Sequence, residues 1–333
     1  MQTPGKVVPA SFFGIVLGLA GLGGAWRLAA KQWGFPAEIG EAIFALAAIV
    51  WALLLGGFIW KWLAARSEAE GELRHPIACC FIGLIFVATA LVAVGVLPYS
   101  RSTAMVLAVV AGVGNVLFSA WRSGGLWQGN RDPGSTTAVL YLPSVAGNFV
   151  TAIIAGALGY EGVGILFFGA GVFSWFAIES VLIQRLFTAA PLPAAVRPTL
   201  GIQLAPPVVG CVAYLAVTGH ADLFAQALFG YGLLQALILL RLFPWFRETG
   251  FAAGYWAFSF GVTAIAQCAL RMAQMGVTGP VADLAPWLFG FANLFVAFLT
   301  IRTLMLLIAG KLFPAPAAAP IPVAPAPPLS PAS

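Results

Sequence analysis

Long apolar runs dominate the chain, and short breaks rich in polar residues, glycine or proline separate them. A helix that crosses a bilayer needs about 20 predominantly apolar residues. Ten runs meet this requirement: Ser11–Ala30, Ile39–Leu63, Pro76–Leu97, Ser102–Trp121, Tyr141–Leu158, Gly162–Phe187, Thr199–Val217, Asp222–Phe243, Phe251–Gln274 and Ala285–Gly310. The pattern predicts an all-α integral membrane protein with ten transmembrane helices.

The same pattern divides the chain into three parts. Residues 1–10 precede the first apolar run, residues 11–310 hold the ten helices, and residues 311–333 are rich in proline and alanine. Because proline-rich segments of this kind do not form a packed core, we expect a disordered tail. The short N-terminus and the tail are both expected on the cytoplasmic side.

Composition and charge agree with a membrane protein. The chain is 61% hydrophobic and 8% charged, whereas soluble domains carry about 25% charged residues. The net charge of +5 comes from basic residues in short loops, which the positive-inside rule explains better than nucleic-acid binding. With the N-terminus inside, twelve of the 16 basic residues are cytoplasmic, and the four outside are Arg27, Lys31, Arg101 and Arg271.

Odd-numbered and even-numbered segments differ in side-chain size. The even ones are rich in Leu and Phe, as suits lipid-facing helices. In the odd ones, small or polar residues recur at helical spacing and share a face: Ser11, Gly14, Gly18 and Gly21; Ser144, Asn148 and Thr151; Gln203 and Gly210. Two explanations stay open, because such faces either let helices pack closely or line a path. Several polar faces together favour an inner ring around a pore.

The ninth segment combines a bulky aromatic with a polar face. Successive helical residues are about 100° apart, so Phe258 and Phe260 point in nearly opposite directions. The residues three, four and seven positions after Phe260 are Thr263, Ala264 and Gln267, which are small or polar. Phe260 therefore lies at one end of a wettable face, where its ring can block a path.

The neighbouring residues complete this hypothesis. We expect Phe258 to pack against outer helices and Gly261 to leave room for a ring to move. The alternative, that both rings are packing aromatics, stays open on these grounds.

Ionisable residues are absent from the membrane core of the odd segments. Ion-coupled carriers usually hold such residues in the membrane, so an uncharged path favours a channel whose selectivity comes from hydrogen-bond donors and overall positive potential instead of a fixed cation. The acidic residue deep in an even segment is Glu179. We expect it to be structural, paired with a base such as Arg185 or capped by polar neighbours.

Catalytic or metal-binding clusters are not evident. His75 and His220 fall in loops, and the four cysteines fall in apolar runs without metal-ligand spacing. We therefore expect no enzyme, no cofactor and no metal site.

Several stretches spread over residues 9–310 carry a resemblance to a known family, among them "SFFGIVLGLAGL", "SGGLWQG", "YLPSVAGNF", "LGIQLAPPVVGCVAYL" and "WAFSFG". The chain resembles the tellurite-resistance/dicarboxylate transporter family, whose plant relatives are the slow-type anion channels. The resemblance implies five helical hairpins with quasi-fivefold symmetry, with the odd helices lining a central pore. It also implies a homotrimer with one pore per subunit, and a gate at Phe260.

Together these observations predict a gated channel of the bacterial inner membrane that passes small anions such as chloride or nitrate. The expected partners are small inorganic anions and membrane lipid. The expected pore-lining residues are Ser11, Gly14, Gly18, Ser144, Asn148, Thr151, Gln203, Thr263 and Gln267. The alternative is a secondary carrier or efflux protein for tellurite, sulfite or dicarboxylates.

Overall fold

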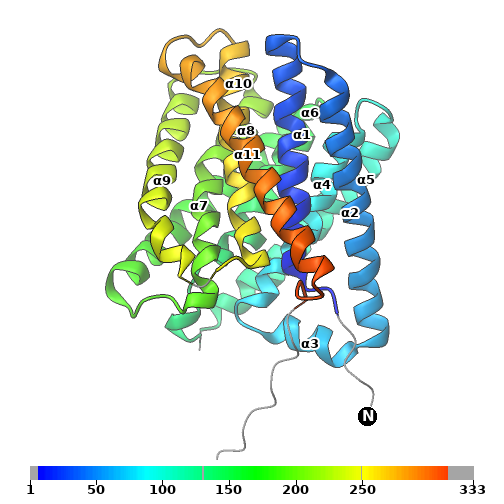
Figure 1. Ribbon diagram of the computed structural model, residues 1–333, viewed down its shortest axis with the longest axis vertical. Helices are drawn as coiled ribbons and strands as arrows, with labels where there is room; N and C mark the ends of the chain where they lie inside the picture. Colours follow the sequence, from blue (N-terminus) through cyan, green and yellow to red (C-terminus); the bar gives the residue numbers. More distant parts are fainter. Residues whose placement is uncertain (1–6, 130, 249, 314–333) are drawn as a thin grey trace, which may run out of the picture.

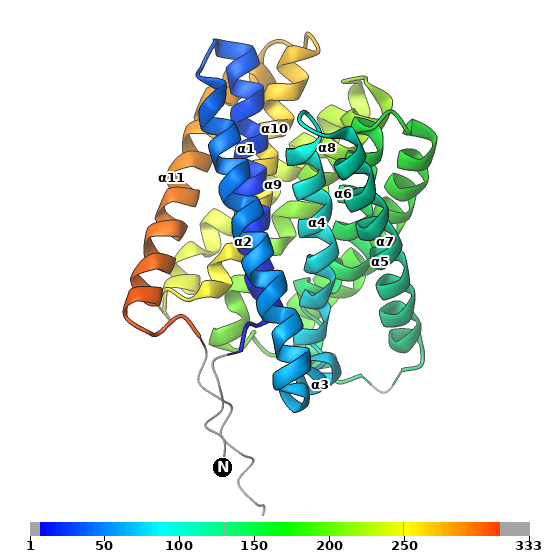
Figure 2. The ribbon, with the colours of Figure 1, turned by 90° about the vertical axis from the view of Figure 1, so that its right-hand side faces the viewer.

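The computed structural model describes residues 7–129, 131–248 and 250–313, which form a bundle of helices (Figures 1 and 2). Ten segments are long and apolar enough to cross a membrane, as predicted. They are Ala10–Trp33, Ala37–Ala64, Ala78–Val96, Arg101–Trp127, Ala138–Ala157, Glu161–Thr188, Ala194–Thr218, Leu223–Arg247, Ala253–Gln274 and Pro280–Ile308. The predicted tail beyond residue 313 and the first six residues lie outside the described part.

The ten spans form an inner and an outer set. In the odd-numbered spans, 72–94% of the membrane window is buried within the protein, against 17–33% in the even-numbered spans. The outer helices are α2 (Ala37–Ala64), α5 (Arg101–Trp127), α7 (Glu161–Thr188), α9 (Leu223–Arg247) and α11 (Pro280–Ile308). The predicted alternation of small-residue and bulky segments thus separates inner from outer helices.

Every inner span has two parts, an irregular first segment and a regular α-helix. The pairs are η1 and α1 (Ala10–Phe12, Phe13–Trp33), η2 and α4 (Ala78–Ile82, Gly83–Val96), η5 and α6 (Leu142–Ala146, Gly147–Ala157), η6 and α8 (Ala194–Leu204, Ala205–Thr218), and η7 and α10 (Ala253–Phe258, Ser259–Gln274). Four first segments are 3-10 helices, and η5, which contains Pro143, is a π-helix. Proline removes a backbone donor, and such local changes of helix type often accompany functional sites.

Both described ends of the chain lie at one end of the bundle, the lower end in Figure 1. The rings of Phe12 and Phe313 are 5.7 Å apart. The short helix α3 (Arg66–Arg74), which the apolar pattern did not predict, lies at the same end.

A buried ion pair ties α3 to the start of the first span. Glu72 pairs with Lys61, which is 2% exposed, and it also accepts a hydrogen bond from the backbone N–H of Ala10 at 2.8 Å. Lys61 donates to the carbonyl of Val8 at 2.8 Å. Removing one partner of a buried pair leaves an uncompensated charge, so these bonds hold the entry of the chain into the bundle.

Candidate functional site

Two cavities lie inside the ring of inner helices, and residues from all five inner spans border each of them. The lower cavity, nearer the chain termini, has a volume of about 70 Å³. The upper cavity has a volume of about 270 Å³. The two cavities are the only candidate for a path along the bundle in the described part of the chain.

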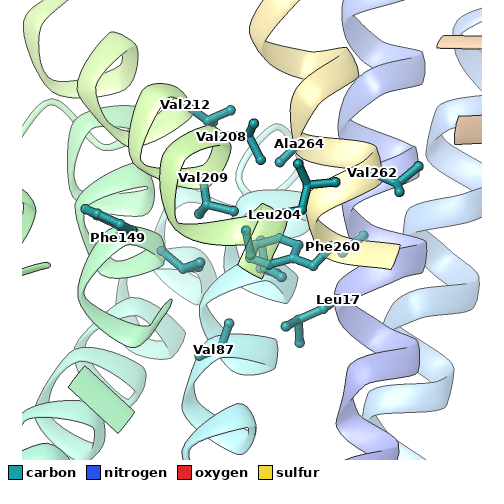
Figure 3. Close-up of a cluster of buried hydrophobic side chains, with 14 of the residues drawn as sticks. Leu17, Val87, Phe149, Leu204, Val208, Val209, Val212, Phe260, Val262 and Ala264 are labelled. Carbon is teal, nitrogen blue, oxygen red and sulfur yellow. The ribbon is translucent and has the colours of Figure 1, made fainter. Parts of the chain in front are cut away.

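Phe260 and Val209 border both cavities. The Phe260 side chain points from α10 into the centre of the bundle, where Leu17, Val209 and Leu204 surround it (Figure 3). Its residual exposure is 7%. The ring therefore stands between the two cavities, where the resemblance and the face analysis both placed it.

The wall of the lower cavity is mostly apolar. Leu17, Leu84, Phe149 and Ile202 contribute to it, together with many other hydrocarbon side chains. Hydroxyl groups enter from a few positions, Tyr141 among them. A narrow apolar passage of this kind favours dewetting.

The upper cavity is cationic. Arg27, Lys31 and Arg271 border it, and no Asp or Glu does so among the described residues. The expectation of a path without a fixed cation is therefore wrong at this end. The physical reason is that long basic side chains at the helix ends reach into the cavity, although their backbone lies near the membrane boundary.

One face of α10 connects the ring to this charge. Phe260, Ala264, Gln267 and Arg271 all border the upper cavity, and their spacing of four, three and four residues keeps them on one face. Arg271 is the functional candidate that the sequence reasoning missed. Its position eleven residues after Phe260 is the signal that could have found it.

The predicted lining residues divide into two groups. Ser11 and Gly14 border the lower cavity, and Gln267 borders the upper one. Gly18 and Thr263 border neither of them. The remaining four are taken up below.

Gly18 and Thr263 lie in the contact between α1 and α10. A methyl group added at Gly18 would come within 2.5 Å of the Ser259 hydroxyl oxygen, and one added at Gly21 would come within 2.1 Å of that of Thr263. Thr263 is 0% exposed. The small-residue face of α1 therefore receives the hydroxyl groups of α10, which is the close-packing explanation left open above.

The polar face of the fifth span turns towards an outer helix. The side-chain oxygen of Asn148 accepts a hydrogen bond from Asn115 of α5 at 3.1 Å, and its amide donates to the carbonyl of Ser144 at 2.6 Å. Thr151 donates to the carbonyl of Gly147 at 2.7 Å. Ser144, Asn148 and Thr151 border neither cavity, so their partners are protein groups.

Gln203 is also buried, at 6% exposure, and borders neither cavity. Its side-chain oxygen has no hydrogen-bond partner among the described residues. Its position on η6 places it near the tyrosine network described next.

Glu179 on α7 is capped by polar neighbours. Its carboxylate accepts hydrogen bonds from the Trp175 indole and the Tyr231 hydroxyl, each at 2.9 Å, and from Tyr141. No ion pair joins it to Arg185 within the described ranges. Of the two structural roles considered, capping is the one the structure contains.

Phe258 packs against outer helices, as expected. Its ring centroid lies 5.4 Å from that of Phe246 on α9 and 6.3 Å from that of Phe295 on α11. The expectation for Gly261 is wrong, because a methyl group there would come within 2.7 Å of the Leu204 side chain. Gly261 permits close approach of η6 and provides no free space for a moving ring.

Ten membrane-spanning helices around an axial pair of cavities define a multi-pass protein of the class that includes helical channels and transporters. The chain belongs to the SLAC1 family: the family described as voltage-dependent anion channel matches residues 7–304. This confirms the resemblance found in the sequence.

Individual relatives agree. The chain is 37% identical to the tellurite resistance protein TehA homolog of Haemophilus influenzae over 308 residues, 92% of this chain and 93% of that protein. It is 24% identical to the S-type anion channel SLAH3 of Arabidopsis thaliana over 309 residues, 89% of this chain and 48% of that protein. The guard cell S-type anion channel SLAC1 of the same plant is 24% identical over 314 residues, 89% and 55% respectively. The chain thus spans about half the length of these plant relatives.

Proposed function

We propose that the protein is a gated channel that passes small anions such as chloride and nitrate along the axis of the inner helices. The observation that carries this proposal is the position of Phe260, which borders a cavity on either side. Passage requires the ring to move aside. Anions then cross by electrodiffusion, without a covalent step.

The distribution of charge supports anions as the permeating species. Three basic residues border the upper cavity without an acid beside them among the described residues, and clefts lined by one sign of charge concentrate the opposite ion. The lower cavity holds no charged residue among those described at its wall. An anion would leave it readily, because weak binding favours fast exit.

The cellular setting is part of the same proposal. We place the protein in the bacterial inner membrane with both termini in the cytoplasm, as the twelve-to-four distribution of basic residues favours. The two described chain ends lie at the same end of the bundle, which is consistent with this topology. We further propose a homotrimer with one path per subunit, on the basis of the family resemblance.

The decisive experiment compares chloride currents through wild type, Phe260→Ala and Phe258→Ala in liposomes. We expect Phe260→Ala to raise the current at least tenfold, since it joins the two cavities, with reversal at the chloride equilibrium potential. Phe258→Ala is the matched control, because it removes the same ring from the opposite face and should not raise the current. A Phe260→Ala current no larger than wild type would falsify the gate.

The carrier alternative, efflux of tellurite, sulfite or dicarboxylates, is favoured by the name of the bacterial relative. It predicts uptake driven by a pH gradient and abolished by Glu179→Gln. Glu179 borders neither cavity and is already satisfied by three donors. We therefore expect currents without proton coupling, and gradient-driven uptake in their absence would establish the carrier instead.

A further inference from the structure

The three basic residues of the upper cavity are not equivalent. Arg27 donates twice to Glu41 of α2, at 2.7 and 2.6 Å, and also to the carbonyls of Val94 and Gly95 at 3.0 and 2.8 Å. Tyr99 donates to the same carboxylate at 2.8 Å. The charge of Arg27 is thus neutralised, and its donors are occupied by protein groups.

Lys31 and Arg271 remain uncompensated. None of the ion pairs formed within the described ranges includes either residue. The Nε of Arg271 is buried and has no hydrogen-bond partner in the described part of the chain. A buried guanidinium donor without a partner is costly, and an anion in the cavity would supply the missing acceptor.

The remaining walls add no charge to this site. The inner helices α4, α6 and α8 contribute Leu91, Val94, Ile153, Val209 and Val212, among other apolar groups. The nearest acid recorded there, Glu41, is held by Arg27. Two positive charges therefore face the cavity, from α1 and α10.

We propose that the upper cavity is a binding site for a hydrated divalent oxyanion, with Arg271 as its principal ligand and Lys31 at the rim. A divalent anion gains from both uncompensated charges, whereas a monovalent anion gains half as much from each. The volume of about 270 Å³ accommodates an anion with several waters, since a water occupies about 30 Å³.

The same anion is excluded from the next stage. Passing Phe260 into the narrow apolar cavity requires loss of hydration, which costs far more for a double charge than for a single one. A divalent oxyanion in the upper cavity therefore blocks the path that a monovalent anion crosses. This inference rests on the proposed function for its readout, but binding itself does not depend on conduction.

The test uses sodium sulfate as the probe. In Phe260→Ala liposomes carrying chloride current, sulfate added on the upper-cavity side should block at low ionic strength, and sulfate on the other side should block at least tenfold more weakly. Arg271→Gln should raise the inhibition constant about tenfold, and Lys31→Gln, at the exposed rim, about threefold. Arg101→Gln is the matched control, because Arg101 lies at the same end of the bundle without bordering the cavity.

Calorimetry of sulfate binding to the purified full chain separates the two proposals. Binding that Arg271→Gln abolishes, in a protein that passes no chloride, would keep the site and reject the channel. Chloride current with equal block from both sides, or block unchanged by Arg271→Gln in a correctly assembled protein, would overturn the site. Sulfate binding that survives in Arg271→Gln and Lys31→Gln would show an adventitious ion only.

Discussion

The two cavities on either side of Phe260 are made by the same five helices, yet their chemistry is opposite. The lower one is small and apolar, and the upper one is larger and bordered by three basic residues. The lower half is built from the irregular first segments of the inner spans, whereas the upper half is built from regular α-helix. The comparison teaches that one ring separates a passage that excludes water from a vestibule that attracts anions.

This division assigns different tasks to the two regions. An electropositive vestibule raises the local concentration of anions, and an apolar constriction decides whether they proceed. The following predictions test the comparison, in order of decreasing effect on the current.

The largest effect should come from the other residue that borders both cavities. In the Phe260→Ala background, we expect Val209→Phe to reduce chloride current at least tenfold, because it places a ring at the same constriction. Val212→Phe is the control on the same helix, since Val212 borders only the wider upper cavity. Retention of the current by Val209→Phe, in protein of unchanged elution volume, would place the constriction elsewhere.

A second effect should distinguish the dry region from the wet one. Leu84 borders the lower cavity and Leu91, two turns further along α4, borders the upper one. We expect Leu84→Asn in the Phe260→Ala background to raise chloride current about threefold by stabilising water in the passage. Leu91→Asn should change it by less than about 1.5-fold, because its surroundings are already polar. Equal effects of both substitutions would contradict the division.

A smaller effect on the current is expected at the polar face of the fifth span. Asn148→Leu leaves buried Asn115 without its partner and should lower the free energy of unfolding by about 1–3 kcal/mol. The double variant Asn115→Leu/Asn148→Leu should recover most of that loss. Anion selectivity should be unchanged in both variants, measured by reversal potentials. A shift in chloride-to-nitrate selectivity would return Asn148 to the pore lining.

The smallest effect should follow Tyr99→Phe. The hydrogen bond to Glu41 raises the pKa of Tyr99 above its ordinary value, so its hydroxyl stays protonated at neutral pH. Because Arg27 keeps both bonds to Glu41, we expect less than a twofold change in current between pH 6 and pH 8 and no new titration. A large change in current would mean that Arg27 contributes free charge to the vestibule.

The division between inner and outer helices could be predicted because it depends on local composition. A helix that faces neighbours on all sides needs small residues, and a helix that faces lipid tolerates Leu and Phe. The same reasoning identified Phe260, because a face analysis needs only the helical period. It could not assign the faces of Thr263 and Asn148 to a pore or to a neighbour. A polar stripe looks the same in both cases, and the choice depends on which helix lies opposite.

The sequence by itself determined the number of spans, their inner or outer position, and the residue at the centre of the path. Those features follow from hydrophobicity and periodicity along one helix. Only the tertiary structure decided that Gly21 receives Thr263, that Arg27 is neutralised by Glu41, and that Arg271 is left facing a cavity. The physical reason is that the state of a charge or a small residue depends on groups distant in the chain, and only packing brings those groups together.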